Sequence, residues 1–180
     1  MRKTIALFMI VATLSTFIGL AAADDDHRPW RRGSEVAPVT DPVYLRECGD
    51  CHLAYPPGLL PARSWQAIMN GLEDHFGDNA ALDAATQGQL LDYLTRNSAD
   101  HADYPRSRKI ARQLTAGDTL LRISELPFFR SEHDELTPAM VRDNPEVGSF
   151  SRCNACHRRA EQGSFREHEI DIPGYGRWED

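Results

Sequence analysis

Apolar residues recur at helical spacing along this chain, and no stretch alternates over the length of a long strand. The segment from Ser64 to Gly77 places apolar side chains at i, i+3, i+4 and i+7. This spacing predicts an amphipathic helix that Ser64 caps and Gly77 ends. Another helix is predicted over 84–97, with Asp83 or Thr86 as its cap. The helical spacing of apolar residues in these segments predicts a mainly α-helical fold.

Proline and charged residues divide the sequence before these helices. Residues 24–40 are charged, contain proline and lack periodicity, so they predict a flexible N-terminal segment. Asp41 followed by Pro42 is typical of a helix start, and it predicts a short helix that carries residues 48–52. The stretch 54–62 holds three prolines and a glycine and predicts a loop.

The pattern changes near residue 99. A basic stretch, a turn with glycine and a brief extended stretch precede a helical stripe with Phe129, His133 and Leu136 at i, i+4 and i+7. We therefore expect two regions, 41–98 and 99–180. The second should be the less regular of the two, with mostly helices and loops.

The first 23 residues have the organisation of an export signal. Arg2 and Lys3 precede an apolar run from Ile5 to Leu20, and three alanines follow. The run is shorter than the roughly 20 residues of a membrane-spanning helix, so it predicts a cleaved signal peptide over 1–23. The mature chain then has 157 residues in the oxidising periplasm and no direct membrane insertion.

Two pentapeptides carry the candidate chemistry. CGDCH spans 48–52 and CNACH spans 153–157, and together they contain all four cysteines of the chain. With four cysteines and seven histidines in 180 residues, chance supplies about 0.003 such matches. The repetition therefore indicates one chemistry used twice.

Three chemistries use cysteines at this spacing. A redox dithiol requires strand–helix–strand surroundings, which the sequence near the first motif does not predict. Paired zinc knuckles usually lie about 15–20 residues apart, whereas these motifs start 105 positions apart. Covalent c-type haem also accounts for the histidine of each motif, so we expect two haems, with His52 and His157 on the irons. The expected attachment residues are Cys48, Cys51, Cys153 and Cys156.

The first haem needs a ligand on its other face. A haem-bearing helix, a proline-rich loop, a ligand-bearing segment and a closing helix resemble a small class I cytochrome c domain, where that ligand is usually methionine. Met69 lies inside the apolar stripe, where methionine usually fills a core. His75 lies at the end of the stripe, where a side chain can reach a metal. We expect His75, with Met69 as the alternative.

Four side chains compete for the second haem. His133 has an aromatic face around it, although its acidic neighbours also fit a salt-bridged surface residue. His101 lies in a polar linker, His168 lies between two glutamates, and Met140 follows a proline in an irregular stretch. We expect His133 and keep the other three as alternatives.

The stretches ECGDCHLAYPPGLLPARSWQAIM, DHFGDNA, LRISELPFF and CNACHRRAEQGSF resemble the dihaem cytochrome c (DHC) family of bacteria over nearly all of the mature chain. The resemblance implies a class I-like N-terminal haem domain followed by a less regular second haem domain. It also implies paired histidine ligands, His52 with His75 and His157 with His133. The family's associations imply a small monohaem cytochrome c or a b-type membrane cytochrome as redox partner.

Two protein ligands leave an iron no open position, so this arrangement predicts an electron carrier rather than an enzyme. Paired imidazoles lack the thioether that raises the potential of methionine-ligated cytochromes, so both potentials should be low. A compact chain of this size, with a radius of gyration of roughly 15 Å, keeps two haems close. The alternative is a dihaem redox enzyme of the peroxidase or oxyanion reductase type, or a gas-binding protein, with one open iron.

The charge of the chain bears on its partners. The formal net charge is −7, and loss of Arg2 and Lys3 with the signal changes it to −9. This balance disfavours nucleic acid and anionic membranes as partners, although ordinary solubility explains it equally well. Arg152, Arg158 and Arg159 form a basic cluster that either steers an acidic redox partner or pairs with haem propionates and internal acids.

Overall fold

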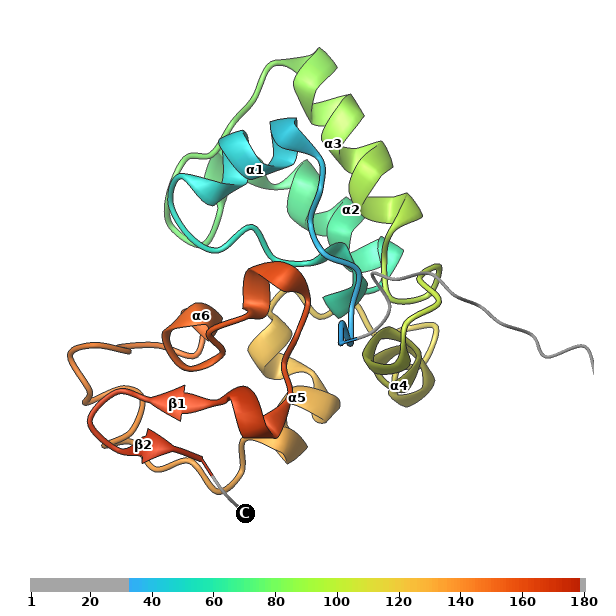
Figure 1. Cartoon of the computed structure of the whole chain (residues 1–180). Helices are drawn as coiled ribbons and strands as arrows, with labels where there is room; N and C mark the ends of the chain where they lie inside the picture. The colour runs from blue at the N-terminus through green and yellow to red at the C-terminus, as the bar shows by residue number, and fades with distance from the viewer. Residues whose placement is uncertain (1–32, 179–180) are drawn as a thin grey trace, which may run out of the picture.

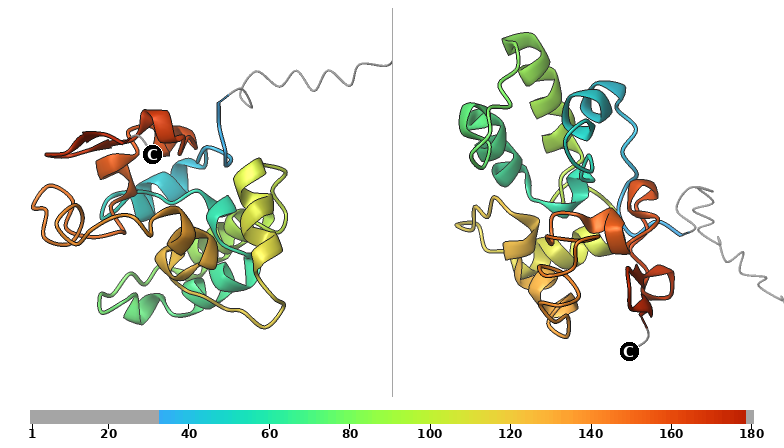
Figure 2. Two further views of the ribbon diagram at one scale, coloured as in Figure 1. Left: turned by 90° about the horizontal axis from the view of Figure 1, so that it is seen from below. Right: turned by 90° about the vertical axis from the view of Figure 1, so that its left-hand side faces the viewer.

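The computed structural model describes residues 33–178, which form two lobes that pack side by side (Figure 1; Figure 2). The first lobe contains α1 (Pro42–Gly49), α2 (Ala62–Asn70) and α3 (Ala84–Arg96). The second contains α5 (Pro127–Glu132), α6 (Cys153–Cys156) and a hairpin of β1 (Asp171–Ile172) and β2 (Gly176–Arg177). The fold is mainly helical, as predicted. The predicted signal peptide over 1–23 lies outside the described residues.

Asp41 fixes the start of α1. Its carboxylate accepts hydrogen bonds from the backbone N–H groups of Val43 at 2.9 Å and Tyr44 at 2.8 Å, as a helix cap does. This start was predicted, but the helix ends at Gly49. Cys48 and Gly49 therefore lie in its last turn, and the last three residues of the first motif follow outside the helix.

Helices α2 and α3 pack against each other and supply much of the core of the first lobe. Their buried side chains include Trp65 and Met69 from α2, and Leu90 and Leu94 from α3. Asp83 caps α3 through its carboxylate, as one of the two predicted caps. The buried position of Met69 agrees with its interpretation as a core residue.

The single helix predicted from Ser64 to Gly77 is wrong. α2 begins at Ala62 and ends at Asn70, and a separate 3₁₀ helix, η3 (Leu72–Asp74), follows. Ser64 lies buried inside α2 instead of capping it. The break occurs because Gly71 ends the α-helical hydrogen bonding, and a glycine carries a low helix propensity.

The proline-rich loop over 54–62 lies inside the molecule. It contains a 3₁₀ helix, η2 (Pro57–Leu59), whose residues are all buried. The indole of Trp65 donates a hydrogen bond to the carbonyl oxygen of Pro57 at 2.8 Å. Prolines suit such a loop because they carry no backbone N–H that burial would leave unpaired. Helix α4 (Pro105–Gln113) contacts η2, and it also contacts α5 of the second lobe.

Residues 33–40 are packed against the second lobe, although the sequence predicted a flexible segment there. The side chain of Val36 is fully buried. The backbone N–H groups of Glu35 and Val36 both donate to the carbonyl oxygen of Gly163, at 2.8 and 3.2 Å. An extended segment held by its backbone needs no repeating apolar pattern, so periodicity could not reveal it.

The second lobe is irregular, as predicted, and its elements are short. Its 3₁₀ helices are η4 (Ile123–Glu125), η5 (Ala160–Gln162) and η6 (Glu167–Glu169). The hairpin pairs Asp171 with Arg177 in antiparallel register, and strands of two residues were too short to predict. Helix α5 ends at Glu132, so the predicted stripe stops there and Leu136 lies in a later turn. No helix within 33–178 is long and apolar enough to cross a membrane.

One hydrophobic core extends through both lobes. Tyr44 and Leu90 of the first lobe belong to the same cluster of buried side chains as Leu126, Phe128 and Phe165 of the second. The lobes therefore stabilise each other. The predicted boundary between the two regions, after residue 98, stays a prediction.

Gly163 provides a test of how the N-terminal segment is held. Gly163 and Gly174 both have positive φ, at +74° and +79°, so alanine at either position costs roughly 1–2 kcal/mol. Only at Gly163 would the new Cβ also collide with the carbonyl oxygen of Val36. Gly163→Ala should therefore lose about 1–3 kcal/mol more unfolding free energy than Gly174→Ala. Equilibrium unfolding in guanidinium chloride measures both, and equal losses would contradict this packing.

Candidate haem sites

The first motif leaves helix α1 at its C-terminal end. Cys48 is half-buried in the last turn, and Cys51 is exposed in the turn that follows. The imidazole of His52 donates from Nδ1 to the carbonyl oxygen of Leu53 at 2.7 Å. This bond orients the ring and leaves Nε2 without a proton, which is the form that binds a metal.

His52 and His75 face each other. Their ring centroids are 6.2 Å apart and their planes differ by 24°. A metal binds an imidazole nitrogen at roughly 2.0–2.1 Å, so two rings on opposite sides of one iron have centroids roughly 6 Å apart. The pair therefore fits one haem iron. Met69, the alternative ligand, is 2% exposed in the hydrophobic core.

A tight turn after η3 places His75. Its backbone N–H donates to the carbonyl oxygen of Asp78 at 2.7 Å, and the N–H of Asp78 donates back at 3.2 Å. Between them Phe76 has a φ of +57°, which is unusual for an aromatic residue, and Gly77 has a φ of +104°. The guanidinium of Arg122 lies 4.1 Å from the centre of the Phe76 ring. The turn thus fixes the backbone on both sides of the expected ligand.

The second motif forms helix α6 and ends at His157. The backbone N–H of His157 donates to the carbonyl oxygen of Cys153 at 2.8 Å, which closes the single turn. The imidazole packs at 5.2 Å from the ring of Phe165. Its Nδ1 atom is buried and has no hydrogen-bond partner among the described residues. The two motif histidines therefore differ in what holds their rings.

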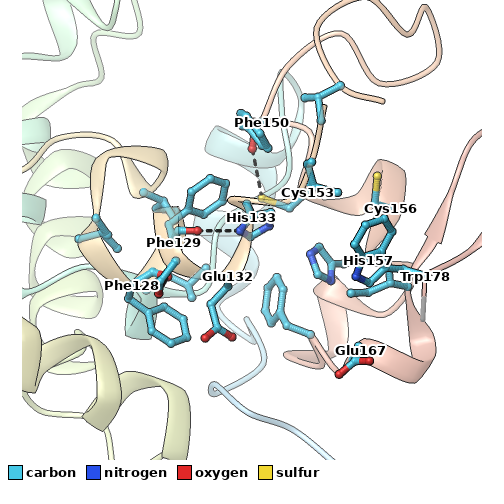
Figure 3. Close-up of a pocket in the computed structure, with 18 of the residues that line it drawn as sticks. Phe128, Phe129, Glu132, His133, Phe150, Cys153, Cys156, His157, Glu167 and Trp178 are labelled. Carbon is cyan, nitrogen blue, oxygen red and sulfur yellow. Dashed lines mark hydrogen bonds between the residues drawn. The ribbon is translucent and has the colours of Figure 1, made fainter. Parts of the chain in front are cut away.

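His133 faces His157 across the second site. The ring centroids are 6.0 Å apart, with an angle of 70° between the planes. His133 stacks on Phe129 at 3.9 Å and donates from Nδ1 to the carbonyl oxygen of that residue at 2.8 Å. Phe150 packs edge-on against the His133 ring at 5.8 Å. Figure 3 shows both imidazoles among these aromatic rings.

A cavity of about 560 Å³ surrounds the second pair. Its walls include Cys153, Cys156 and both histidines, together with aromatic side chains (Figure 3). Cofactor sites in proteins commonly have roughly 300–1,000 Å³ and mostly apolar walls. The residues present therefore fit a haem attached through the two cysteines and bound between the two imidazoles.

Burial controls the protonation of the site residues. It lowers the pKa of His75, His133 and His157, the last to about 4, so the rings are neutral near pH 7 and available to a metal. Burial also raises the pKa of the Cys48 and Cys153 thiols to about 11. A reactive redox dithiol has a lowered pKa instead. Within 33–178, no three His, Cys, Asp or Glu side chains converge as a metal cluster.

The remaining candidates for the second ligand lie elsewhere. His101 is exposed and bonds the carbonyl oxygen of Thr95 through Nδ1 at 2.7 Å. The side chain of His168 is 68% exposed. Met140 is half-buried in the turn that precedes Asn144. The structure brings His133, and none of these three, into ring contact with His157.

The predicted basic cluster is mostly neutralised by internal acids. Arg158 pairs with Asp171 at 3.5 Å, and Arg159 pairs with Glu169 at 2.7 Å. Arg152 donates to a backbone carbonyl instead, that of Val147, at 3.4 Å. These pairs favour the structural interpretation of the cluster over a role in docking.

Tyr55 joins the two sites, and the sequence analysis missed it. Its ring stacks on His52 at 4.8 Å with an angle of 19° between the planes. Its hydroxyl donates to the carbonyl oxygen of Ser151 at 2.6 Å, just before Cys153. Burial raises the pKa of Tyr55 to about 12, which keeps the hydroxyl protonated as a donor. An aromatic residue three positions after His52 was the local signal in the sequence.

Comparisons with known proteins agree with this geometry. The sequence profile of the dihaem cytochrome c (DHC) family matches residues 44–165. A dihaem c-type cytochrome from Shewanella baltica OS155 is similar at 43% identity and a TM-score of 0.63, covering 77% of this chain and 97% of that one. A dihaem cytochrome c from Rhodobacter sphaeroides is similar at 48% identity and a TM-score of 0.65, covering 72% and 100%. No curated relative matches the chain.

Removal of the Tyr55 hydroxyl tests the contact between the sites. Tyr55→Phe keeps the ring on His52 but loses the bond to Ser151, so the unfolding free energy should fall by about 0.5–1.5 kcal/mol. Tyr175→Phe is the control, because that side chain is 51% exposed. Loss of its hydroxyl should lower the unfolding free energy by less than about 0.5 kcal/mol. Denaturant unfolding followed by circular dichroism compares them. A loss at Tyr55 no larger than that at Tyr175 would contradict a stabilising contact.

Proposed function

Because the chain belongs to the dihaem cytochrome c family, we propose that it is a periplasmic electron carrier whose two haem irons each lie between two histidines. The family resemblance predicted from the motifs is confirmed. Membership gives the chain two covalently attached c-type haems and a role in electron transfer. The proposed attachment residues are Cys48 and Cys51 for the first haem, and Cys153 and Cys156 for the second.

The facing imidazole pairs carry this proposal. His52 faces His75 at 6.2 Å, and His157 faces His133 at 6.0 Å, the separation that suits two rings on one iron. Each pair joins a histidine of an attachment motif to one placed by a separate element. The two pairs are the proposed iron ligands.

Such ligation suits electron transfer. A bound haem iron supplies one-electron chemistry, and ligands on both of its faces leave no position for a substrate. The aromatic rings of Phe129, Phe150 and Phe165 pack against the imidazoles of the second pair. Two neutral imidazoles without a thioether also favour low reduction potentials. We therefore propose a carrier and not an enzyme.

The proposed location and partners rest on the sequence. The signal pattern over 1–23 supports export, and the c-type motifs suit an oxidising compartment. The proposed partners are redox proteins, either a small monohaem cytochrome c or a b-type membrane cytochrome. The net negative charge of the chain favours partners with basic docking faces.

Carbon monoxide tests the ligation, because it binds ferrous haem only where an iron has an open or labile position. The reduced protein should show no spectral change with the gas. His75→Ala and His133→Ala should each open one iron, so that about half of the haem responds. His101→Ala, at an exposed histidine, is the matched control and should show no spectral change with carbon monoxide. A response from the unaltered protein would favour the enzyme or gas-binding alternative.

The ring angles predict two different ferric spectra. The imidazole planes differ by 24° at the first pair and by 70° at the second. Nearly parallel rings separate the energies of the two iron d orbitals that π-bond with them, whereas nearly perpendicular rings keep those energies close. Electron paramagnetic resonance of the oxidised protein should therefore show one rhombic low-spin signal and one low-spin signal with a single large g value. Two identical signals would contradict the geometry.

A further inference from the structure

Arg106 is a partly buried cation in the wall of the second haem cavity. Its side chain is 15% exposed, whereas that of Arg108, on the same helix α4, is 47% exposed. Removal of a guanidinium from water costs free energy unless close partners compensate. The partners of Arg106 therefore indicate what its burial serves.

These partners come from three other segments of the chain. The guanidinium lies 2.8 Å from a carboxylate oxygen of Glu35 and 3.5 Å from one of Glu132. It also donates to the carbonyl oxygen of Phe165 at 3.3 Å. The Cζ atom of Arg106 lies 5.1 Å from the ring centre of Phe128 and 5.7 Å from that of Phe165. Arg106 thus ties the N-terminal segment, α5 and the segment before η6 into one wall.

The same wall touches both proposed ligands of the second iron. The ring of Phe165 packs on that of His157. Glu132 directly precedes His133 in the chain, and both are labelled in Figure 3. The Nε–H group of Arg106 is buried and has no acceptor among the described residues, so the wall retains a spare donor.

We propose that Arg106 sets the reduction potential of the second haem by holding a positive charge beside it. This inference rests on the proposed function. Reduction adds one electron, supplied by a redox protein, to the ferric iron, and a nearby cation stabilises the ferrous product while carboxylates oppose it. Glu35 and Glu132 balance the charges of Arg106 and Lys109, whose Nζ lies 3.0 Å from Glu132. Loss of either Arg106 or Glu35 therefore unbalances the wall, in opposite directions.

The test compares Arg106→Gln, Glu35→Gln and the matched control Arg108→Gln by potentiometric titration, with the second haem identified by its ferric resonance signal. At a fixed ambient potential, Arg106→Gln should lower the ratio of reduced to oxidised second haem about tenfold, the order expected for one partly buried charge. Glu35→Gln should raise that ratio, and its amide oxygen can still accept from the Phe165 N–H. Arg108→Gln should change it by less than about twofold, because the exposed charge is screened by solvent.

A purely structural role gives a different result. If Arg106 only closes the cavity, Arg106→Gln and Glu35→Gln both admit water and move the second haem in the same direction, which overturns the proposal. Arg106→Lys keeps the charge and should restore most of the ratio. If Arg106→Gln does not fold, the direction of the Glu35→Gln shift decides. Carbon monoxide added to the unaltered protein tests the histidine ligation separately, so failure of that ligation is distinguishable from failure of this inference.

Discussion

The proposed ligation requires two imidazoles to meet at one iron from opposite sides, and the rest of the structure is arranged around this constraint. In both lobes the facing rings lie about 6 Å apart, at 6.2 and 6.0 Å. A residue in mid-helix is tied to the helix face by its neighbours. Both His75 and His133 instead follow the last residue of a short helix, after η3 and α5. Because these helices end sooner than predicted, the side chains of the two proposed ligands are not confined to a helix face.

The two sites are held together by contacts between residues far apart in the sequence. Tyr55 stacks on His52 and bonds to Ser151, 96 positions later. Glu35 pairs with Arg106, 71 positions later, and the core cluster contains side chains from both lobes. Because these contacts fix one lobe against the other, the distance between the haem sites is a property of the fold rather than of a linker. This arrangement suits electron exchange within one molecule.

The sequence predicted what local chemistry determines. The caps at Asp41 and Asp83 and the mainly helical class follow from residues adjacent in the chain, and the structure has them. The helix stop at Gly71 was missed because the apolar spacing continues past it, and spacing alone does not show where backbone hydrogen bonding ends. The packing of 33–40 and the partners of Arg106 were missed for another reason. Both depend on partners that only the folded chain brings near, so no local pattern reports them.

The two haem sites share a donor set but differ in what surrounds it. The ring of His52 is held by a hydrogen bond to a carbonyl oxygen, whereas Nδ1 of His157 has none among the described residues. Beside the first site Phe76 is 45% exposed, whereas the second is lined by packed aromatic rings and a partly buried arginine. Hydrogen bonding to the ligand, burial and nearby charge are the means by which a protein adjusts a haem potential when the ligands are the same. All three differ between the two proposed sites, so the fold surrounds the same pair of proposed ligands with two different environments.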